Sequence, residues 1–383
     1  MDAAMPAVAR ATARTTPAAS APARTLILTH RRVDPIASRC ATFEFEDLIR
    51  AVDAVDVFPL GRPIGATLRP RLRRWTAAAL APLLPPVASR TQPYELLFVS
   101  LHSLGDLARL LPLPRFASAA RRTACNVDEL WLSQLRGRAH ELSMLRGFDV
   151  LFTACRGAVD EIQRLVGRPC HYLAPAVDTL RFCPGAPPRS RTIDVYFMGR
   201  RRPALHRAVQ QAAAARDRLY LFDTAIAHTV HDPVEHREQL AELVRRTRYF
   251  VVDVAKADRA DESSRQPEIG TRFFEGAAGG AVMFGVVPDT RAFVELFPWD
   301  DAAIPVEPDP ARIAALLDEL DASRERVAAI RRANVVGALR RHDGAYRWRE
   351  VLAAVGLEPL PALSERVREL ELRADSIEHA GLG

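Results

Sequence analysis

The chain has 383 residues, of which 48% are hydrophobic and 26% are charged, and its formal net charge is +6. This composition is typical of a soluble globular protein, and the length allows two domains of ordinary size. No apolar run reaches the roughly 18 residues that cross a bilayer. The basic residues stand among acidic ones without interleaved aromatic residues, so we expect no binding to nucleic acid and only a modest attraction to phosphorylated ligands or anionic membrane surfaces.

The N-terminal segment and the cysteines bear on the compartment. Residues 1–23 are rich in Ala, Thr, Pro and Arg and contain no continuous apolar segment. We interpret them as a disordered tail, with a transit peptide as the alternative. The five cysteines are odd in number, scattered and mostly embedded in apolar runs. This arrangement indicates buried, reduced thiols in a cytoplasmic protein and gives no paired metal-ligand spacing.

From Thr25 onward, strand-like and helix-like segments alternate, which indicates parallel sheets with crossover helices. The predicted strands of the first half cover residues 25–29, 55–60, 95–101, 123–127, 150–154 and 170–173. The clearest helix between them covers residues 157–166, with Gly167 at its C-terminal cap position and Pro169 just beyond.

A proline-rich loop at residues 175–190 interrupts this pattern, and we expect the domain hinge there. A second set of predicted strands covers residues 193–198, 219–223, 249–254, 281–286 and 303–306. After Pro308 the chain is predicted to be helical. The apolar residues of the last segment fall on one face of an amphipathic helix, and they are Leu363, Val367, Leu370, Ala374 and Ile377.

The most informative segment runs from Glu268 to Gly280, between two predicted strands. We expect a loop followed by a helix, with Glu268 and Glu275, seven residues apart, on one helix face and directed into the same cleft. Free N–H groups at the start of the helix, around Gly270, Thr271 and Arg272, would bind a phosphate. Two carboxylates beside an anion site suit a nucleotide sugar.

The segment from Glu268 to Gly280 resembles an element of a known family. The run Glu-x6-Glu-Gly-Ala-Ala-Gly-Gly resembles the donor-binding element of the GT-B glycosyltransferases, in the large family 1-like group. Residues 175–184 also resemble the linker of these enzymes, with its Val-Asp-x-x-x-Phe-x-Pro pattern. The resemblance implies that Glu275 binds the ribose of the donor nucleotide and that Glu268 lies near the transferred sugar as a catalytic residue. Many retaining members have the spacing Glu-x7-Glu instead.

Two cationic positions are candidates for the diphosphate. Gly199, Arg200 and Arg201 follow a predicted strand and precede a helix that starts at Pro203, so the guanidinium groups and the helix end would form a diphosphate clamp. This turn is similar to the Gly-Arg turn of the family, and a solvated basic turn is the alternative. Lys256, the single lysine among 53 basic residues, also follows a predicted strand, where open α/β sheets bind ligands; the alternative is a mobile surface position.

The N-terminal half offers candidates at the ends of two predicted strands. His102 ends one apolar run, and many retaining members of the family carry a histidine near the donor sugar at a comparable place; an imidazole there would hydrogen-bond a sugar hydroxyl or handle a proton. Asp128, Glu129 and Trp131 follow the next strand and suit the acceptor side, because an indole ring offers an apolar face to a sugar. The alternatives are a capping or core role for His102 and helix capping by Asp128.

The sequence therefore predicts an α/β protein of the GT-B type, with two Rossmann-like parallel-sheet domains facing across a cleft. We assign residues 24–175 to an acceptor-side domain, residues 176–345 to a nucleotide-sugar-binding domain, and residues 346–383 to helices that cross back to the first domain. No metal site is indicated, and no cofactor is expected beyond the nucleotide sugar as co-substrate.

The implied function is transfer of a sugar from a nucleotide-sugar donor to a glycan, lipid-linked or small-molecule acceptor hydroxyl, with retention and without a metal. Two alternatives stay open. A nucleotide-sugar epimerase of the same fold would keep the donor site and lack an acceptor groove. A non-catalytic GT-B-like scaffold module would turn over no donor, and the Glu-x6-Glu spacing is the feature that favours it.

Overall fold

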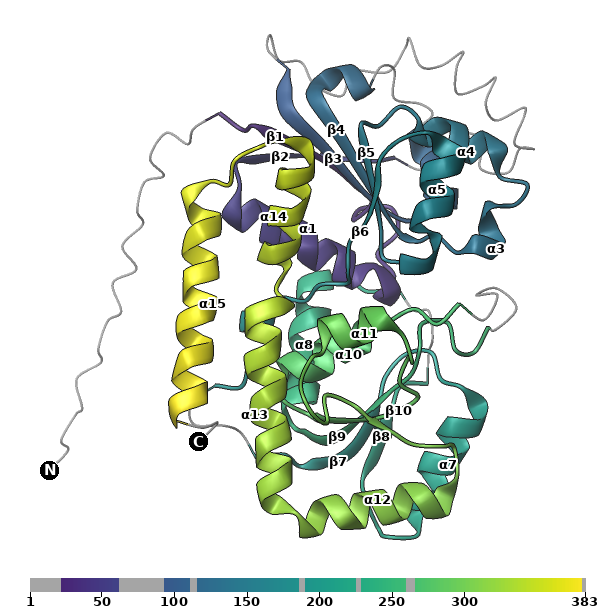
Figure 1. Cartoon of the computed structure of the whole chain (residues 1–383), viewed down its shortest axis with the longest axis vertical. Helices are drawn as coiled ribbons and strands as arrows, with labels where there is room; N and C mark the ends of the chain where they lie inside the picture. Colours follow the sequence, from purple (N-terminus) through teal and green to yellow (C-terminus); the bar gives the residue numbers. More distant parts are fainter. Residues whose placement is uncertain are drawn as a thin grey trace, which may run out of the picture.

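A computed structural model of the chain describes residues 22–61, 93–110, 116–185, 190–224, 229–259 and 266–380. Most of the predicted N-terminal tail therefore lies outside the described residues. Two parallel β-sheets with helices around them form separate layers, one above the other in Figure 1. Among the described residues, no helix combines the length and apolar character that crossing a membrane requires.

The N-terminal sheet has six strands in the order β2-β1-β3-β4-β5-β6, and all neighbours are parallel. Its strands are β1 (Thr25–Thr29), β2 (Val55–Pro59), β3 (Tyr94–Ser103), β4 (Ala120–Glu129), β5 (Val150–Thr153) and β6 (Cys170–Tyr172). The buried strand residues are mostly Leu, Ile, Val and Phe, which suits strands covered on both faces. Each strand lies where the apolar runs predicted it.

The C-terminal sheet has five strands in the order β11-β10-β9-β7-β8, again all parallel. Its strands are β7 (Ile193–Phe197), β8 (Tyr220–Phe222), β9 (Thr247–Val252), β10 (Val282–Gly285) and β11 (Ile304–Pro305). Two parallel-sheet domains, each with crossover helices, confirm the predicted fold class.

The helices connect the strands. Those of the N-terminal half are η1 (Ala37–Arg39), α1 (Cys40–Val52), η3 (Leu104–Arg109), η4 (Phe116–Ala119), α3 (Leu132–Leu135), α4 (Ala139–Leu145), η5 (Arg156–Ala158) and α5 (Val159–Val166). Those that follow are α6 (Thr179–Phe182), α7 (Pro203–Ala214), α8 (Pro233–Arg245), α10 (Thr271–Ala278), α11 (Arg291–Leu296), α12 (Pro310–Ala322), α13 (Arg324–Arg341), α14 (Gly344–Val355) and α15 (Pro361–Ala380). Helix α5 ends as its sequence predicts, because Gly167 adopts a left-handed conformation (φ 70°) at the C-cap.

Helix α14 packs against the N-terminal domain, whereas α15 lies alongside α13 and also contacts α1 and α14 (Figure 1). The indole of Trp348 in α14 lies edge-on to Phe98 of β3, with ring centroids 5.4 Å apart, and its Nε1 donates to Asp53 Oδ2 at 2.9 Å. Leu370 and Ala374 of α15 belong to the same buried cluster. One side of the N-terminal core is therefore built from the end of the chain.

The two chain crossings between the domains are tied together. The backbone N–H and the hydroxyl of Thr179, at the start of α6, both donate to Asp343 Oδ2, at 3.0 and 2.8 Å. Arg366 of α15 donates to the same carboxylate and to Asp178 Oδ1, at 2.8 and 2.7 Å. These buried and half-buried contacts fix the N-cap of α14 beside the N-cap of α6.

Candidate functional site

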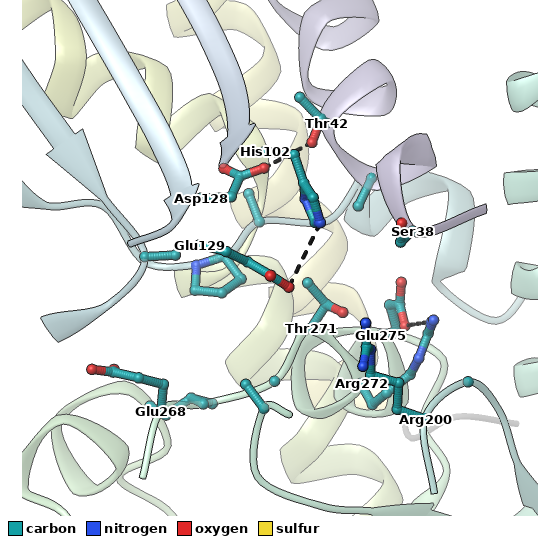
Figure 2. Close-up of a pocket in the computed structure, with 18 of the residues that line it drawn as sticks. Ser38, Thr42, His102, Asp128, Glu129, Arg200, Glu268, Thr271, Arg272 and Glu275 are labelled. Atoms are coloured by element: carbon teal, nitrogen blue, oxygen red, sulfur yellow. Dashed lines mark hydrogen bonds and ion pairs between the residues drawn. The ribbon is translucent and has the colours of Figure 1, made fainter. Parts of the chain in front are cut away.

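A cavity of about 400 Å³ lies between the two domains. Its walls come from the carboxyl ends of β3, β4 and β5 on one side and from those of β7, β8 and β9 on the other. The N-terminus of α10 and the segment around α1 close it further (Figure 2). Ligands of open α/β sheets bind at this edge of the strands.

The glycine turn after β7 forms part of the C-terminal wall. Gly199 has a φ of +84°, a conformation that favours glycine, and its N–H donates to Asp223 Oδ1 at 2.8 Å. Arg200 lines the cavity and lies 3.3 Å from Asp258, with its side chain partly exposed. A guanidinium at this place is available to an anionic ligand.

Arg201, the second arginine of the predicted clamp, is directed elsewhere. Its Nη1 binds Asp223 Oδ1 at 2.6 Å and the carbonyl of Gly199 at 2.9 Å, and its guanidinium lies over the ring of Phe222. It is absent from the cavity wall. In this structure Arg201 supports the turn, whereas Arg200 faces the cavity.

Helix α10 starts at the cavity wall. Its N-cap is Gly270, which has no side chain to bind the first N–H groups, and Thr271 and Arg272 also line the cavity. A Cβ atom at position 270 would lie 3.2 Å from the carbonyl oxygen of Asp253, so a glycine lets the loop approach β9 closely. Uncapped N–H groups at a helix start provide donors and a positive potential for a phosphate.

Glu275 lies deeper in α10 and is 1% exposed. One of its carboxylate oxygens is bound by Arg272 and the other by Arg237 of α8. Burial opposes ionisation, but these two guanidinium groups hold the pKa of Glu275 below its ordinary value. Glu275 is nevertheless one of the residues that line the cavity (Figure 2).

Glu268 does not share a helix face with Glu275, so that part of the prediction is wrong, although both glutamates line the same cavity, as predicted. The helix begins only at Thr271, because Gly270 is its extended N-cap, and Glu268 lies in the preceding loop. Figure 2 shows the two glutamates at opposite sides of the site. The Glu268 carboxylate accepts the backbone N–H groups of Arg156 and Gly157, both at 2.9 Å, across the domain boundary. Its catalytic role stays a prediction.

His102 and Glu129 lie on the N-terminal wall, at the ends of the neighbouring strands β3 and β4 (Figure 2). His102 Nε2 is 3.7 Å from Glu129 Oε1, and the other oxygen of Glu129 is 2.9 Å from Nζ of Lys256. The backbone N–H of His102 donates to the buried Asp106, which fixes the end of β3. One carboxylate thus bridges an imidazole of the first domain and an ammonium of the second.

Lys256 reaches this position from the loop after β9 in a left-handed conformation (φ 53°). Its side chain is only 6% exposed, and its ammonium lies 5.4 Å from the ring centroid of Trp131. Trp131 itself is 1% exposed within the N-terminal core, with Lys256 over one face. Lys256, which was predicted on the donor side, therefore contacts Glu129 and Trp131, which were both predicted on the acceptor side.

Asp128, the third acceptor-side candidate, is held by its own domain. It accepts hydrogen bonds from Thr42 Oγ1 at 2.8 Å and from Asn126 Nδ2 at 2.6 Å. Burial raises its pKa, against the opposing effects of His102 and these two donors. Asp128 lies beside His102 in Figure 2, so a second carboxyl stands at this wall.

With this geometry in place, comparison with known proteins identifies the architecture. Residues 200–353 match a family model described as glycosyl transferase-like. A glycosyltransferase from Rickettsia africae superposes with a TM-score of 0.56 at 11% sequence identity, over 88% of this chain and 98% of that one. HepE from Anabaena, solved with UDP and glucose, superposes with a TM-score of 0.52 at 11% identity, over 87% of this chain and 99% of that one.

The chain has the GT-B fold. The matched family region includes the cavity residues of the second domain from Arg200 onward, so the predicted resemblance to glycosyltransferases is confirmed there. No curated protein sequence matches the chain.

The GT-B cleft also contains residues that sequence reasoning missed. Ser38 of η1 and Thr42 of α1 line it, and Arg237 lines it from the middle of α8. The position of Arg237 in the sequence could have identified it. Positions 237, 240, 241 and 244 form one buried helix face, and an arginine on a buried face requires a charged partner. Within the described ranges, no three His, Cys, Asp or Glu side chains are grouped so as to hold a metal ion.

Proposed function

We propose that the protein transfers a sugar from a nucleoside diphosphate sugar to an acceptor hydroxyl, with retention and without a metal. One observation carries this proposal. A single cavity presents the uncapped start of α10 with Arg200 and Arg272 on one wall and the His102–Glu129 pair on the other. HepE from Anabaena, which has the same fold, was solved in complex with UDP and glucose.

The second domain supplies the donor site. The N–H groups at Thr271 and Arg272, together with the guanidinium of Arg200, would bind the diphosphate, and Gly199 leaves room for it beside the backbone. The carboxylate of Glu275 would accept hydrogen bonds from the ribose hydroxyls. When the bond between the anomeric carbon and the phosphate oxygen breaks, its electron pair goes to the departing diphosphate, where these donors stabilise the added charge. Arginine supplies the positive charge that a metal provides in other sites.

The first domain supplies the acceptor side. The imidazole of His102 faces the donor wall, and Glu129 lies within 3.7 Å of it, so this pair would hydrogen-bond the transferred sugar or take up the acceptor proton. Because the cavity lies between two domains, their closure would exclude water and limit donor hydrolysis. The acceptor would be a glycan, a lipid-linked sugar or a small molecule, and all five cysteines are free and buried, as suits the cytoplasm.

The test begins with binding and proceeds to transfer. UDP, ADP, GDP and dTDP are compared by thermal shift, since a ligand of the folded state raises the melting temperature according to its affinity. Sugar derivatives of the diphosphate that binds are then incubated with hydroxyl acceptors, with and without EDTA, and the anomeric configuration of the product is read by NMR. We expect a retained configuration at an EDTA-insensitive rate.

Other results would overturn the proposal in distinct ways. Interconversion of the donor sugar without an acceptor would identify an epimerase. Tight diphosphate binding with no turnover of any donor would identify a scaffold module. Absence of diphosphate binding to the folded protein would reject the donor site itself.

A further inference from the structure

A buried group of charges joins the two domains beside the cavity. It consists of Glu44 in α1, Arg237 in α8 and Glu275 in α10, and their side chains are 2%, 3% and 1% exposed. Glu44 belongs to the first domain, and the other two belong to the second. Arg237 and Glu275 line the cavity, whereas Glu44 does not.

The guanidinium of Arg237 divides its donors between the domains. Its Nη2 donates to Glu44 Oε2 at 2.8 Å, while its Nη1 donates to Glu275 Oε1. Arg181 and the backbone N–H of Asp178, in the hinge, hold Glu44 from behind at 3.0 and 3.1 Å. Each carboxylate therefore has a fixed position relative to the planar fork of Arg237.

This arrangement restricts independent motion. The five donors of a guanidinium lie in one rigid plane, so moving α1 relative to α10 must lengthen the contact with Glu44, turn the contact with Glu275, or do both. Breaking either contact would remove one of the two guanidinium partners of a carboxylate that is almost completely buried, which is unfavourable. Arg237 also lies 4.9 Å from the ring centroid of Phe182 in the hinge helix α6, which limits its sideways movement.

We propose that Arg237 is a positioning residue for Glu275 and that Glu44 anchors it from the opposite domain, so that nucleotide binding is coupled to the relative orientation of the domains. This inference rests on the proposed function, in which Glu275 binds the ribose. Coupling is reciprocal: if the first domain holds Glu275 in its binding orientation, then a nucleotide at Glu275 stabilises the contact of α1 with α8.

The test removes the anchor and leaves the binding site intact. Glu44→Gln abolishes the negative charge of a residue outside the cavity, and we expect the dissociation constant of the best of UDP, ADP, GDP and dTDP to rise about tenfold, within the usual range for coupled sites. Asp53→Asn is the matched control. Asp53 is a buried carboxylate at the other end of α1 that binds Trp348 and Arg24 and makes no contact with Glu275. It should leave the affinity within twofold.

A second measurement tests whether a bound diphosphate stabilises the contact of α1 with α8. In the wild type, a saturating diphosphate should slow hydrogen exchange in α1, and this protection should persist in Asp53→Asn and be lost in Glu44→Gln. If Glu44→Gln does not fold, Glu44→Asp keeps the charge but shortens the side chain, and it should weaken binding and protection to a lesser extent.

The outcomes separate this inference from the proposed function. A wild type that binds a diphosphate without protection of α1, or a folded Glu44 variant with unchanged affinity, would overturn the coupling alone. A wild type that binds none of the four diphosphates would overturn the proposed function and this inference with it.

Discussion

His102 and Glu129 face each other at the ends of adjacent strands, opposite the start of α10. We expect His102→Ala to lower the rate of single-turnover transfer and to leave diphosphate affinity within about twofold, because groups used mainly in the transition state affect rate more than ground-state binding. The transfer rate and a binding isotherm are measured on one preparation. Full activity in the variant would assign His102 to a structural role at the end of β3.

Glu275 should act on the nucleotide instead. Glu275→Gln removes the negative charge between Arg237 and Arg272, and we expect diphosphate binding to weaken by about 1 to 3 kcal/mol, as for the loss of a hydrogen bond to a charged group. Calorimetry on the folded variant measures this change. Glu295→Gln, in the exposed pair with Arg291 on α11, is the control and should have no effect. An unchanged affinity in Glu275→Gln would reject the ribose role.

Glu46 gives a prediction about pH. It is buried in α1, where Thr29 Oγ1 donates to it at 2.6 Å, and burial raises its pKa from 4.5 to about 8. The folded state therefore binds the proton of the Glu46 carboxyl more tightly than the unfolded state does. The free energy of unfolding of the wild type consequently falls as the pH rises from about 4.5 to about 8. Glu46→Gln cannot ionise, and its stability relative to the wild type should rise by up to about 1.4 kcal/mol per pH unit.

Urea unfolding at pH 5, 6.5 and 8 measures this difference. Glu95→Gln, on an exposed position of β3, is the control and should differ from the wild type equally at all three values. A difference for Glu46→Gln that does not change with pH would show that Glu46 is ionised in the folded protein.

At the scale of elements, Arg200 and Arg201 in the turn between β7 and α7 have different surroundings. Arg200 faces the cavity, whereas Arg201 is bound to Asp223 and to the carbonyl of Gly199. Arg200→Ala should therefore weaken diphosphate binding far more than nucleoside binding, because it removes a direct cation. Arg201→Ala should weaken both ligands alike by loosening the turn. Calorimetry with UDP and uridine, or the matching pair for another base, distinguishes these patterns; the same profile for both variants would contradict the assignment.

The sequence predicts these elements well because their signals are local. Strands such as β1, β5 and β10 are buried on both faces and have apolar sequences, and Gly167 ends α5 through its own left-handed conformation. The start of α10 lies where the sequence predicts it, at Gly270 and Thr271, but the helical spacing was extended back to Glu268, which lies in the loop before this start. The consequence was specific: Glu268 was assigned to a face that it does not occupy.

The partners of the site residues depend on contacts that no local pattern contains. Lys256 meets Glu129, and Glu268 meets the start of η5, only because two separately folded sheets face each other. Arg237 lies 38 residues from Glu275 and 193 from Glu44. Single-sequence reasoning identifies which side chains carry charge toward the cleft, whereas the pairing across the cleft follows from the tertiary arrangement.

At the scale of the whole molecule, α15 is predicted to contribute to the stability of the first domain. Leu370 is 0% exposed in the core that α15 shares with the N-terminal sheet, whereas Leu372 on the same helix is 63% exposed. Leu370→Ala should lower the free energy of unfolding by about 2 to 5 kcal/mol through loss of buried surface and the cavity left behind. Leu372→Ala should change it by less than about 0.5 kcal/mol. Chemical denaturation monitored by tryptophan fluorescence tests both, and equal effects would contradict the packing.

The return of α14 and α15 to the N-terminal sheet also sets an order of events during protein synthesis. The strands of the first sheet have all been synthesised once residue 172 has been made, but α14 and α15, which complete the cover of one sheet face beside α1, are made only at residues 344–380. At about 5 to 20 residues per second, roughly 200 intervening residues take about 10 to 40 s. During that interval the apolar part of the sheet face that these helices will cover is open to chaperones and to neighbouring nascent chains, while the second domain acquires its own sheet. Of the two described domains, the one whose strands are made earlier is therefore completed later.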